Sequence, residues 1–110
     1  MAKRLSIETR VLRIVLKGCS NPRTWTKDVA ARLKDGTPAE INVDGVKMRC
    51  AGGWLYFARN KLDHYSYGAE DALQDACSEL YGEDYVNVND GKDGRRRVVR
   101  ACKLALKTVE

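Results

Sequence analysis

Three consecutive arginines, Arg95, Arg96 and Arg97, follow a polar, glycine-rich turn and stand at the predicted start of an amphipathic helix. The amino end of a helix already carries positive charge from its aligned peptide dipoles, so cations are unfavourable there. Sequences often break a local rule of this kind at a functional site. With Lys92 and Arg100, the free backbone N–H groups and the guanidinium groups would bind a phosphate or an acidic protein surface. The turn is not a P-loop, because the G-x-x-x-x-G-K-[ST] spacing is absent.

The alternative interpretation of these arginines is intramolecular. The segment 69–85 contains no Lys or Arg, and the outer face of its predicted helix carries Glu70, Asp71, Asp75 and Glu79. Adjacent antiparallel helices of opposite charge can neutralise each other. If these carboxylates reach the arginines, the cluster is structural. If the arginines point outward without partners, the cluster is a binding site.

Basic residues also form a stripe on each of the first and last predicted helices. The chain has a formal net charge of +5 and a pI of about 9.1, which fits nucleic acid or an acidic protein as partner. If the two helices lie side by side, their stripes make one positive face, as in a nucleic-acid binder. No helix-turn-helix, zinc-finger or RNP pattern accompanies them. The stripes consist of Arg10, Arg13 and Lys17 in the first helix and of Arg96, Arg100, Lys103 and Lys107 in the last.

Cysteine chemistry is the third candidate. Cys50 precedes a predicted helix, whose amino end would lower the thiol pKa, and His64 is the single histidine that could act as its base. The intervening helix would hold the two residues about 18 Å apart, so we expect no catalytic pair and treat Cys50 as a packed residue. The four cysteines form no C-x-x-C pair, and residues 87–93 fail the calcium-loop frame, so we expect neither a metal nor a cofactor.

The elements that must position these residues belong to one domain, 1–110. Periodicity predicts four helices, over 6–18 with Ser6 as N-cap, 50–62, 69–81 and 94–108 with Asp93 as N-cap. Residues 29–33 alternate like a short strand, and Asp44-Gly45 predicts a two-residue hairpin over 40–49. In that hairpin Val43 opposes Val46, Ile41 opposes Met48 and Glu40 opposes Arg49. The expected fold is α+β but mainly α: four helices around one core, with a small hairpin inserted between the first and second.

Several further residues are expected to be structural. Gly53, with the glycine before it, weakens the second helix and indicates close packing of backbone against another element. Trp25 and Trp54 are expected to anchor the core. Asn89 and Asp90 are expected to shape the turn before the last helix. No apolar run is long enough to span a bilayer, and no signal peptide is recognisable, so we expect a cytoplasmic protein, in the host cytoplasm if it is viral.

With these residues in view, the chain resembles a family of short phage and bacterial proteins known only as a domain of unknown function. The resemblance covers most of the chain and consists of Trp25-Thr26, Cys50-Ala-Gly-Gly53 and Asn89-Asp90, followed by an amphipathic closing helix. Two positions depart from the family pattern: Thr24 replaces a glycine before the tryptophan, and Trp54 stands where an alanine is expected. The resemblance implies a phage or prophage origin and supplies no catalytic residue.

These observations lead to a ranked set of hypotheses. We expect a non-enzymatic accessory protein of phage type. Its charged surface would bind a host macromolecule, namely a protein with an acidic surface. A host-takeover or anti-defence role is an analogy with other small phage proteins. The first alternative is a nucleic-acid-binding protein that uses the basic face of the first and last helices. The second, a cysteine-dependent enzyme, is disfavoured by the separation of Cys50 and His64.

Overall fold

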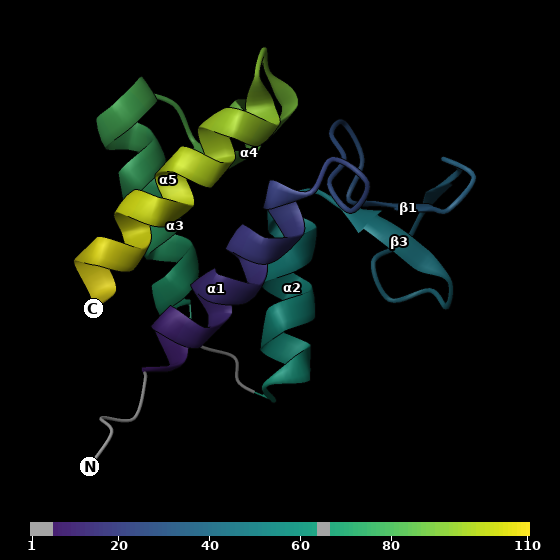
Figure 1. Ribbon diagram of the computed structural model, residues 1–110, viewed down its shortest axis with the longest axis horizontal. Coiled ribbons are helices and arrows are strands. Elements are labelled where there is room, and N and C mark those ends of the chain that lie inside the picture. Colours follow the sequence, from purple (N-terminus) through teal and green to yellow (C-terminus); the bar gives the residue numbers. More distant parts are fainter. Residues whose placement is uncertain (1–5, 64–66) are drawn as a thin grey trace.

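The computed structural model describes residues 6–63 and 67–110. Within these residues the chain forms five helices and a small three-stranded antiparallel sheet, which lies in sequence between α1 (Ile7–Ser20) and α2 (Ala51–Lys61). The helices pack together as one body, and the sheet projects to one side beyond α2 (Figure 1). The protein is therefore mainly helical with a minor β component. None of the described helices is both long and apolar enough to cross a membrane.

The first and last helices begin close to their predicted positions. Ser6 caps α1, because its hydroxyl oxygen accepts a hydrogen bond from the backbone N–H of Thr9 (3.1 Å). The last helix, α5, spans Gly94–Val109. Asp93 occupies its N-cap position in the left-handed conformation (φ 55°) and makes no capping hydrogen bond. The predicted N-cap position is therefore right, but the Asp93 side chain does not cap the helix, because side-chain capping requires an extended backbone at that residue.

A short helix that the sequence does not predict stands before α5. It follows α3 (Gly68–Tyr81) and is α4 (Tyr85–Asp90), whose N-cap Asp84 accepts from the N–H of Asn87 (2.8 Å). Its valine and asparagine residues are weak helix formers, and the segment is too short to show a helical period. Tertiary packing of the buried Val88 stabilises it instead. Asn89 and Asp90 therefore end a helix, rather than forming the turn that we expected.

The predicted hairpin over 40–49 is wrong. The sheet order is β2 (Pro38–Ala39), β1 (Ala31–Leu33), β3 (Val46–Arg49), so β3 pairs with β1 and not with the residues before Asp44. Residues 40–45 form turns, closed in part by a hydrogen bond from the N–H of Val43 to the carbonyl of Glu40 (3.2 Å). The Asp44-Gly45 turn is closed by a hydrogen bond from the N–H of Val46 to the carbonyl of Val43 (3.4 Å), but no strand ladder continues from it. Met48 and Arg49 pair with β1 and not with Ile41 and Glu40 as expected. Partners on both edges of β1 satisfy more backbone groups than an isolated hairpin would, so tertiary pairing overrides the local turn signal.

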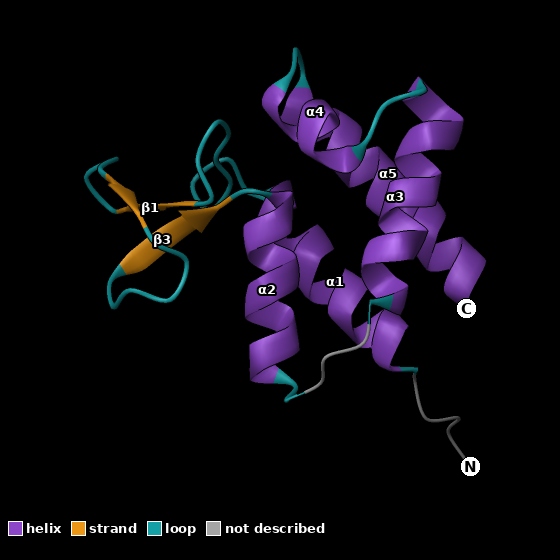
Figure 2. Ribbon diagram, turned by 180° about the vertical axis from the view of Figure 1, so that it is seen from behind, coloured by secondary structure: helices purple, strands orange, loops and turns teal. Residues whose placement is uncertain are grey.

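The five described helices lie together, apart from the sheet (Figure 2). One hydrophobic core joins them. The largest fully buried apolar side chains are Leu12, Leu55, Leu73, Val15, Val88 and Val98. The helix α1 packs against α2 and α5, and α5 also packs against α3. Cys19, Cys77 and Cys102 are buried free thiols in this core. Because α1 and α5 are direct neighbours, their outer surfaces adjoin.

Candidate functional site

The side chain of Asn89 joins three segments that are far apart in sequence. Its Oδ1 accepts hydrogen bonds from Trp25 Nε1 (2.8 Å) and from the backbone N–H of Ala51 (3.0 Å). Its Nδ2 donates to the carbonyl of Thr26 (3.1 Å) and to Asp90 Oδ1 (3.0 Å). A primary amide offers two donors and two acceptor positions, and all four are used here. Asn89, only 2% exposed, therefore ties α4 to the loop after α1 and to the start of α2.

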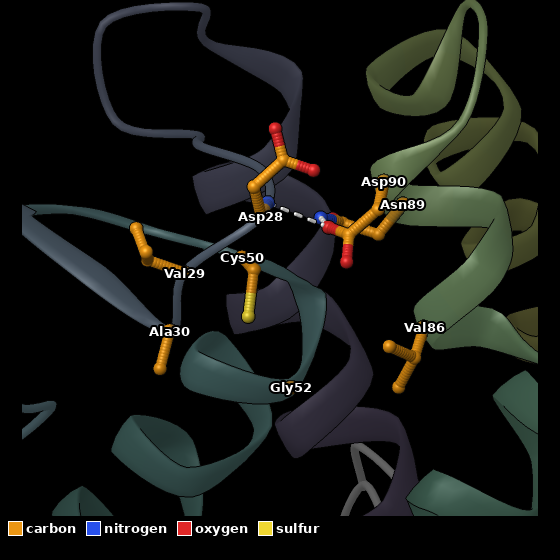
Figure 3. A pocket seen from close by; sticks show the side chains of 8 residues that line it. All are labelled: Asp28, Val29, Ala30, Cys50, Gly52, Val86, Asn89 and Asp90. Carbon is orange, nitrogen blue, oxygen red and sulfur yellow. Dashed lines mark hydrogen bonds between the residues drawn. The ribbon is translucent and has the colours of Figure 1, made fainter.

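The neighbouring carboxylate extends this junction. Asp90 Oδ1 also accepts from the backbone N–H of Asp28 (2.8 Å), a contact drawn in Figure 3. Asp28 has a left-handed backbone (φ 69°), which is uncommon for a residue with a Cβ. The contact with Asp90 helps to hold the loop in this conformation. The family-like residues Trp25, Cys50, Asn89 and Asp90 are thus brought together in space.

A cavity of about 230 Å³ lies beside this junction. Cys50 and Val86 line it from different elements, together with the carboxylate-bearing Asp28 and Asp90 (Figure 3). Cys50 is the N-cap of α2, and its Sγ accepts from the N–H of Gly53 (3.3 Å).

The environment of Cys50 does not activate its thiol. Burial raises the pKa of Cys50 and outweighs the lowering effect of the Gly53 N–H, while the charge of Asp90 raises it further. The expectation that the helix start lowers this pKa is therefore wrong, because desolvation disfavours the thiolate more than the helix end favours it. The proposed base, His64, lies outside the described residues. At neutral pH Cys50 is a protonated thiol, which is a poor nucleophile.

Within residues 6–63 and 67–110, no three His, Cys, Asp or Glu side chains are grouped closely enough to hold a metal ion.

Gly53 and Trp54 serve packing in different places. A Cβ on Gly53 would lie 2.6 Å from the carbonyl oxygen of Ala30, so the close backbone approach that we expected is present. The Trp54 ring covers Gly18, where a Cβ would overlap it, and its Nε1 donates to the carbonyl of Thr24 (3.0 Å). Trp54 therefore anchors α1 to α2 and lies apart from the Asn89 junction.

The three arginines at the start of α5 have three different environments. Arg95 Nη1 donates to the carbonyl of Ser20 (2.9 Å), the last residue of α1. The contact explains why Arg95 is tolerated at the amino end of α5: its positive charge lies at the carboxyl end of α1, which carries negative charge from the helix dipole. Arg95 is thus a contact between α1 and α5.

Arg97 faces α3 instead. Its guanidinium stacks over the Tyr81 ring (4.2 Å to the centroid), and its Nη2 lies 3.5 Å from Glu83 Oε2. None of the four carboxylates proposed as partners pairs with an arginine of this cluster; Glu70 pairs with Arg59 (3.3 Å). Arg97 therefore does pair with a carboxylate of the same chain, as the intramolecular interpretation expects, but the partner is Glu83 and not one of the four carboxylates proposed.

Arg96 is exposed, as is Lys92 in the preceding turn. Among the described residues, neither side chain has an ion-pair or hydrogen-bond partner. Arg96 lines two shallow hollows of about 300 and 280 Å³. The second hollow also includes Val99, Arg100 and Lys103.

The two basic stripes adjoin. The Arg95–Ser20 contact joins the start of α5 to the end of α1, and Arg13 Nη2 lies 3.8 Å from Glu110 Oε1 at the other end, so the helices run antiparallel (Figure 1). We call their joint outer surface the α1–α5 basic face. It consists of seven exposed side chains: Arg10, Arg13, Lys17, Arg96, Arg100, Lys103 and Lys107.

Some residues of the junction were not foreseen from the sequence. Asp28 enters it through its backbone N–H, so its side-chain type gives no signal, and Thr26, named only as part of the resemblance, enters it through its carbonyl. The available signal was the pair Asn89-Asp90 itself, because a buried asparagine must find partners for four hydrogen-bonding positions.

No protein-family model, curated protein or solved structure matches the chain. The family resemblance therefore rests on its short motifs.

Proposed function

We propose that this protein is a non-enzymatic binding protein whose α1–α5 basic face contacts an acidic surface on another protein. The observation that carries the proposal is the composition of this face. Seven exposed cations adjoin there, and Glu110 is the one described carboxylate that pairs with any of them. Such an arrangement steers and orients an oppositely charged partner. Because the resemblance implies a phage origin, we expect that partner to be a host protein.

The seam between the two stripes favours a protein over nucleic acid. Val99 is half-buried in the hollow beside Ser20, and Leu16 stands one helical turn before Ser20 on the same side of α1. Both side chains pack partly against the core, and the apolar surface that they leave between the charged stripes resembles the mixed apolar and polar surface of a protein interface. The large exposed hydrophobic side chains of the described residues (Val43, Tyr56, Tyr67 and Val86) lie on other elements, so the face offers no aromatic platform for bases.

The test must separate the exposed arginine from its structural neighbours. Replacing all three arginines would also remove the Arg95–Ser20 and Arg97–Glu83 contacts, so a loss of binding would have two explanations. A double variant, Arg96→Gln with Arg100→Gln, removes two exposed charges and leaves those contacts intact. The matched control is Lys34→Gln with Lys47→Gln, which removes two exposed charges near the sheet.

Proteins captured from nuclease-treated host lysate by the parent chain and by both double variants are compared quantitatively, and the captured partner is then purified for affinity measurement. Loss of two surface ion pairs is expected to weaken the partner's binding by about tenfold in the Arg96/Arg100 variant. The Lys34/Lys47 variant should bind as the parent does. Equal binding by both variants would contradict the proposal.

Nucleic-acid binding by the same face is the competing outcome. It predicts retention of DNA or RNA with an affinity that falls steeply as salt rises. Retention of that kind, with no protein captured after nuclease treatment, would replace the proposal by the nucleic-acid alternative.

A further inference from the structure

A second cationic site lies away from the α1–α5 basic face, where α2 meets the loop before β3. A hollow of about 300 Å³ is lined there by Arg49 from β3, Asn42 from the loop, and Tyr56, Phe57, Asn60 and Lys61 from α2. It shares no residue with the α1–α5 basic face. None of the residues that line it is acidic.

The guanidinium of Arg49 is fixed in position but has no anionic partner among the described residues. Its guanidinium stacks over the rings of Phe57 (4.3 Å) and Trp54 (4.9 Å), which fix its orientation. Its Nε is buried and has no hydrogen-bond partner, and no described carboxylate pairs with the group. Burial accordingly lowers the pKa of Arg49. Among the described residues no hydrogen bond or ion pair uses the Nη atoms of Arg49, so these outer nitrogens are available to an anion in the hollow.

Lys61 supplies a second positive charge. Its Nζ lies 5.8 Å from the centroid of the same Phe57 ring, and its side chain is exposed at the edge of the hollow. Two cations without a lining carboxylate favour a dianion over a single carboxylate. A phosphate monoester carries nearly two charges at neutral pH and offers several acceptor oxygens to a guanidinium.

The rest of the hollow suits an aromatic ring with polar edges. Tyr56 lines it with 42% of its surface exposed, one of the few large exposed aromatic groups in the described chain. Base–aromatic stacking contributes about 1–3 kcal/mol. The exposed amides of Asn42 and Asn60 each provide donors and an acceptor, which can hydrogen-bond to a base or a ribose.

We propose that this hollow binds a nucleoside monophosphate, with the phosphate held between Arg49 and Lys61 and the base stacked on Tyr56. The volume is at the lower end of the range for small-molecule sites, which suits a mononucleotide rather than a larger cofactor. The site is independent of the basic face, so either proposal can fail alone.

The test is a titration of the isotope-labelled protein with AMP, inorganic phosphate and adenosine, followed by amide NMR shifts. We expect AMP to shift residues 56–61 and 42 saturably, and to bind at least about tenfold more tightly than phosphate or adenosine. Lys61→Gln should weaken AMP about tenfold. Tyr56→Ala should weaken AMP and leave phosphate unchanged.

A matched control keeps the test decisive. Lys47→Gln removes an exposed lysine of β3 that does not line the hollow, and it should bind AMP as the parent does. The test substitutes Lys61 and not Arg49, because Lys61 is exposed and its replacement should leave the fold intact, whereas Arg49 packs against two aromatic rings. Absence of saturable shifts up to about 10 mM AMP would overturn the proposal. So would adenosine or phosphate binding as tightly as AMP, an unaffected Lys61→Gln variant, or shifts confined to α1 and α5.

Discussion

Replacing Asn89 by alanine is expected to destabilise the protein more than any exposed substitution would. The change leaves three protein groups without a partner: Trp25 Nε1, the N–H of Ala51 and the carbonyl of Thr26. A buried group without a partner costs about 1–3 kcal/mol, and because the half-buried Trp25 can regain water we take the lower part of this range, a total of about 3–5 kcal/mol. A domain of this length has a free energy of unfolding of about 5–15 kcal/mol, so the loss is a large fraction of it.

Urea unfolding followed by tryptophan fluorescence measures this loss. With an m-value of about 1–1.5 kcal/mol per molar urea, the midpoint should fall by about 2–5 M. Asn87→Ala is the matched control, because Asn87 lies on the same helix, is exposed and bonds only to Asp84. It should change stability by no more than about 0.5 kcal/mol. A loss below about 1 kcal/mol for Asn89→Ala would refute the reasoning, since water would then replace the amide without cost.

Three further changes have directions set by the structure. Gly53→Ala should lower the free energy of unfolding in urea by about 1–3 kcal/mol, because the new Cβ would lie 2.6 Å from the Ala30 carbonyl oxygen. Gly52→Ala is the control: its Cβ would have its nearest contact at 3.6 Å, so it should be neutral or stabilise by up to about 1 kcal/mol. Raising the pH from about 8 to about 10 should lower the free energy of unfolding. Burial raises the pKa of Cys102 to about 12 in the folded protein, so in this pH range only the unfolded chain loses the thiol proton. A free energy of unfolding that does not change between these pH values would contradict this. Iodoacetamide should alkylate Cys50 more slowly at pH 7 than free cysteine, because burial raises its pKa, and a rate equal to free cysteine would show an accessible, ordinary thiol.

The helices with strong apolar periodicity were predictable, and the elements held by tertiary contacts were not. The helices α1, α2, α3 and α5 match their predicted ranges within about two residues, because each has a continuous buried stripe. The short α4 has no such stripe. Its only buried side chains are Val88 and Asn89, and the second of these is stabilised by partners more than 35 residues away.

The Asp44-Gly45 signal failed for a related reason. Gly45 does take the positive φ (88°) that a turn of this kind needs, so the local prediction is right about the residue. The strand pairing is decided by β1, which offers both its edges to partners and so draws β3 away from the segment before the turn. Turn chemistry indicates where a chain reverses and does not determine which strand it pairs with.

The arginine cluster shows why adjacent residues in a helix seldom form one site. Successive residues of a helix point about 100° apart, so Arg95, Arg96 and Arg97 face α1, solvent and α3 respectively. Residues that act together are three or four positions apart, as Arg96, Arg100, Lys103 and Lys107 are. The charge that stands out in the sequence is thus divided between two packing contacts and one position of a longer stripe. A binding surface built on α5 must follow that stripe, and Arg96 is the member of the triplet whose loss should weaken binding while leaving the packing of α5 unchanged.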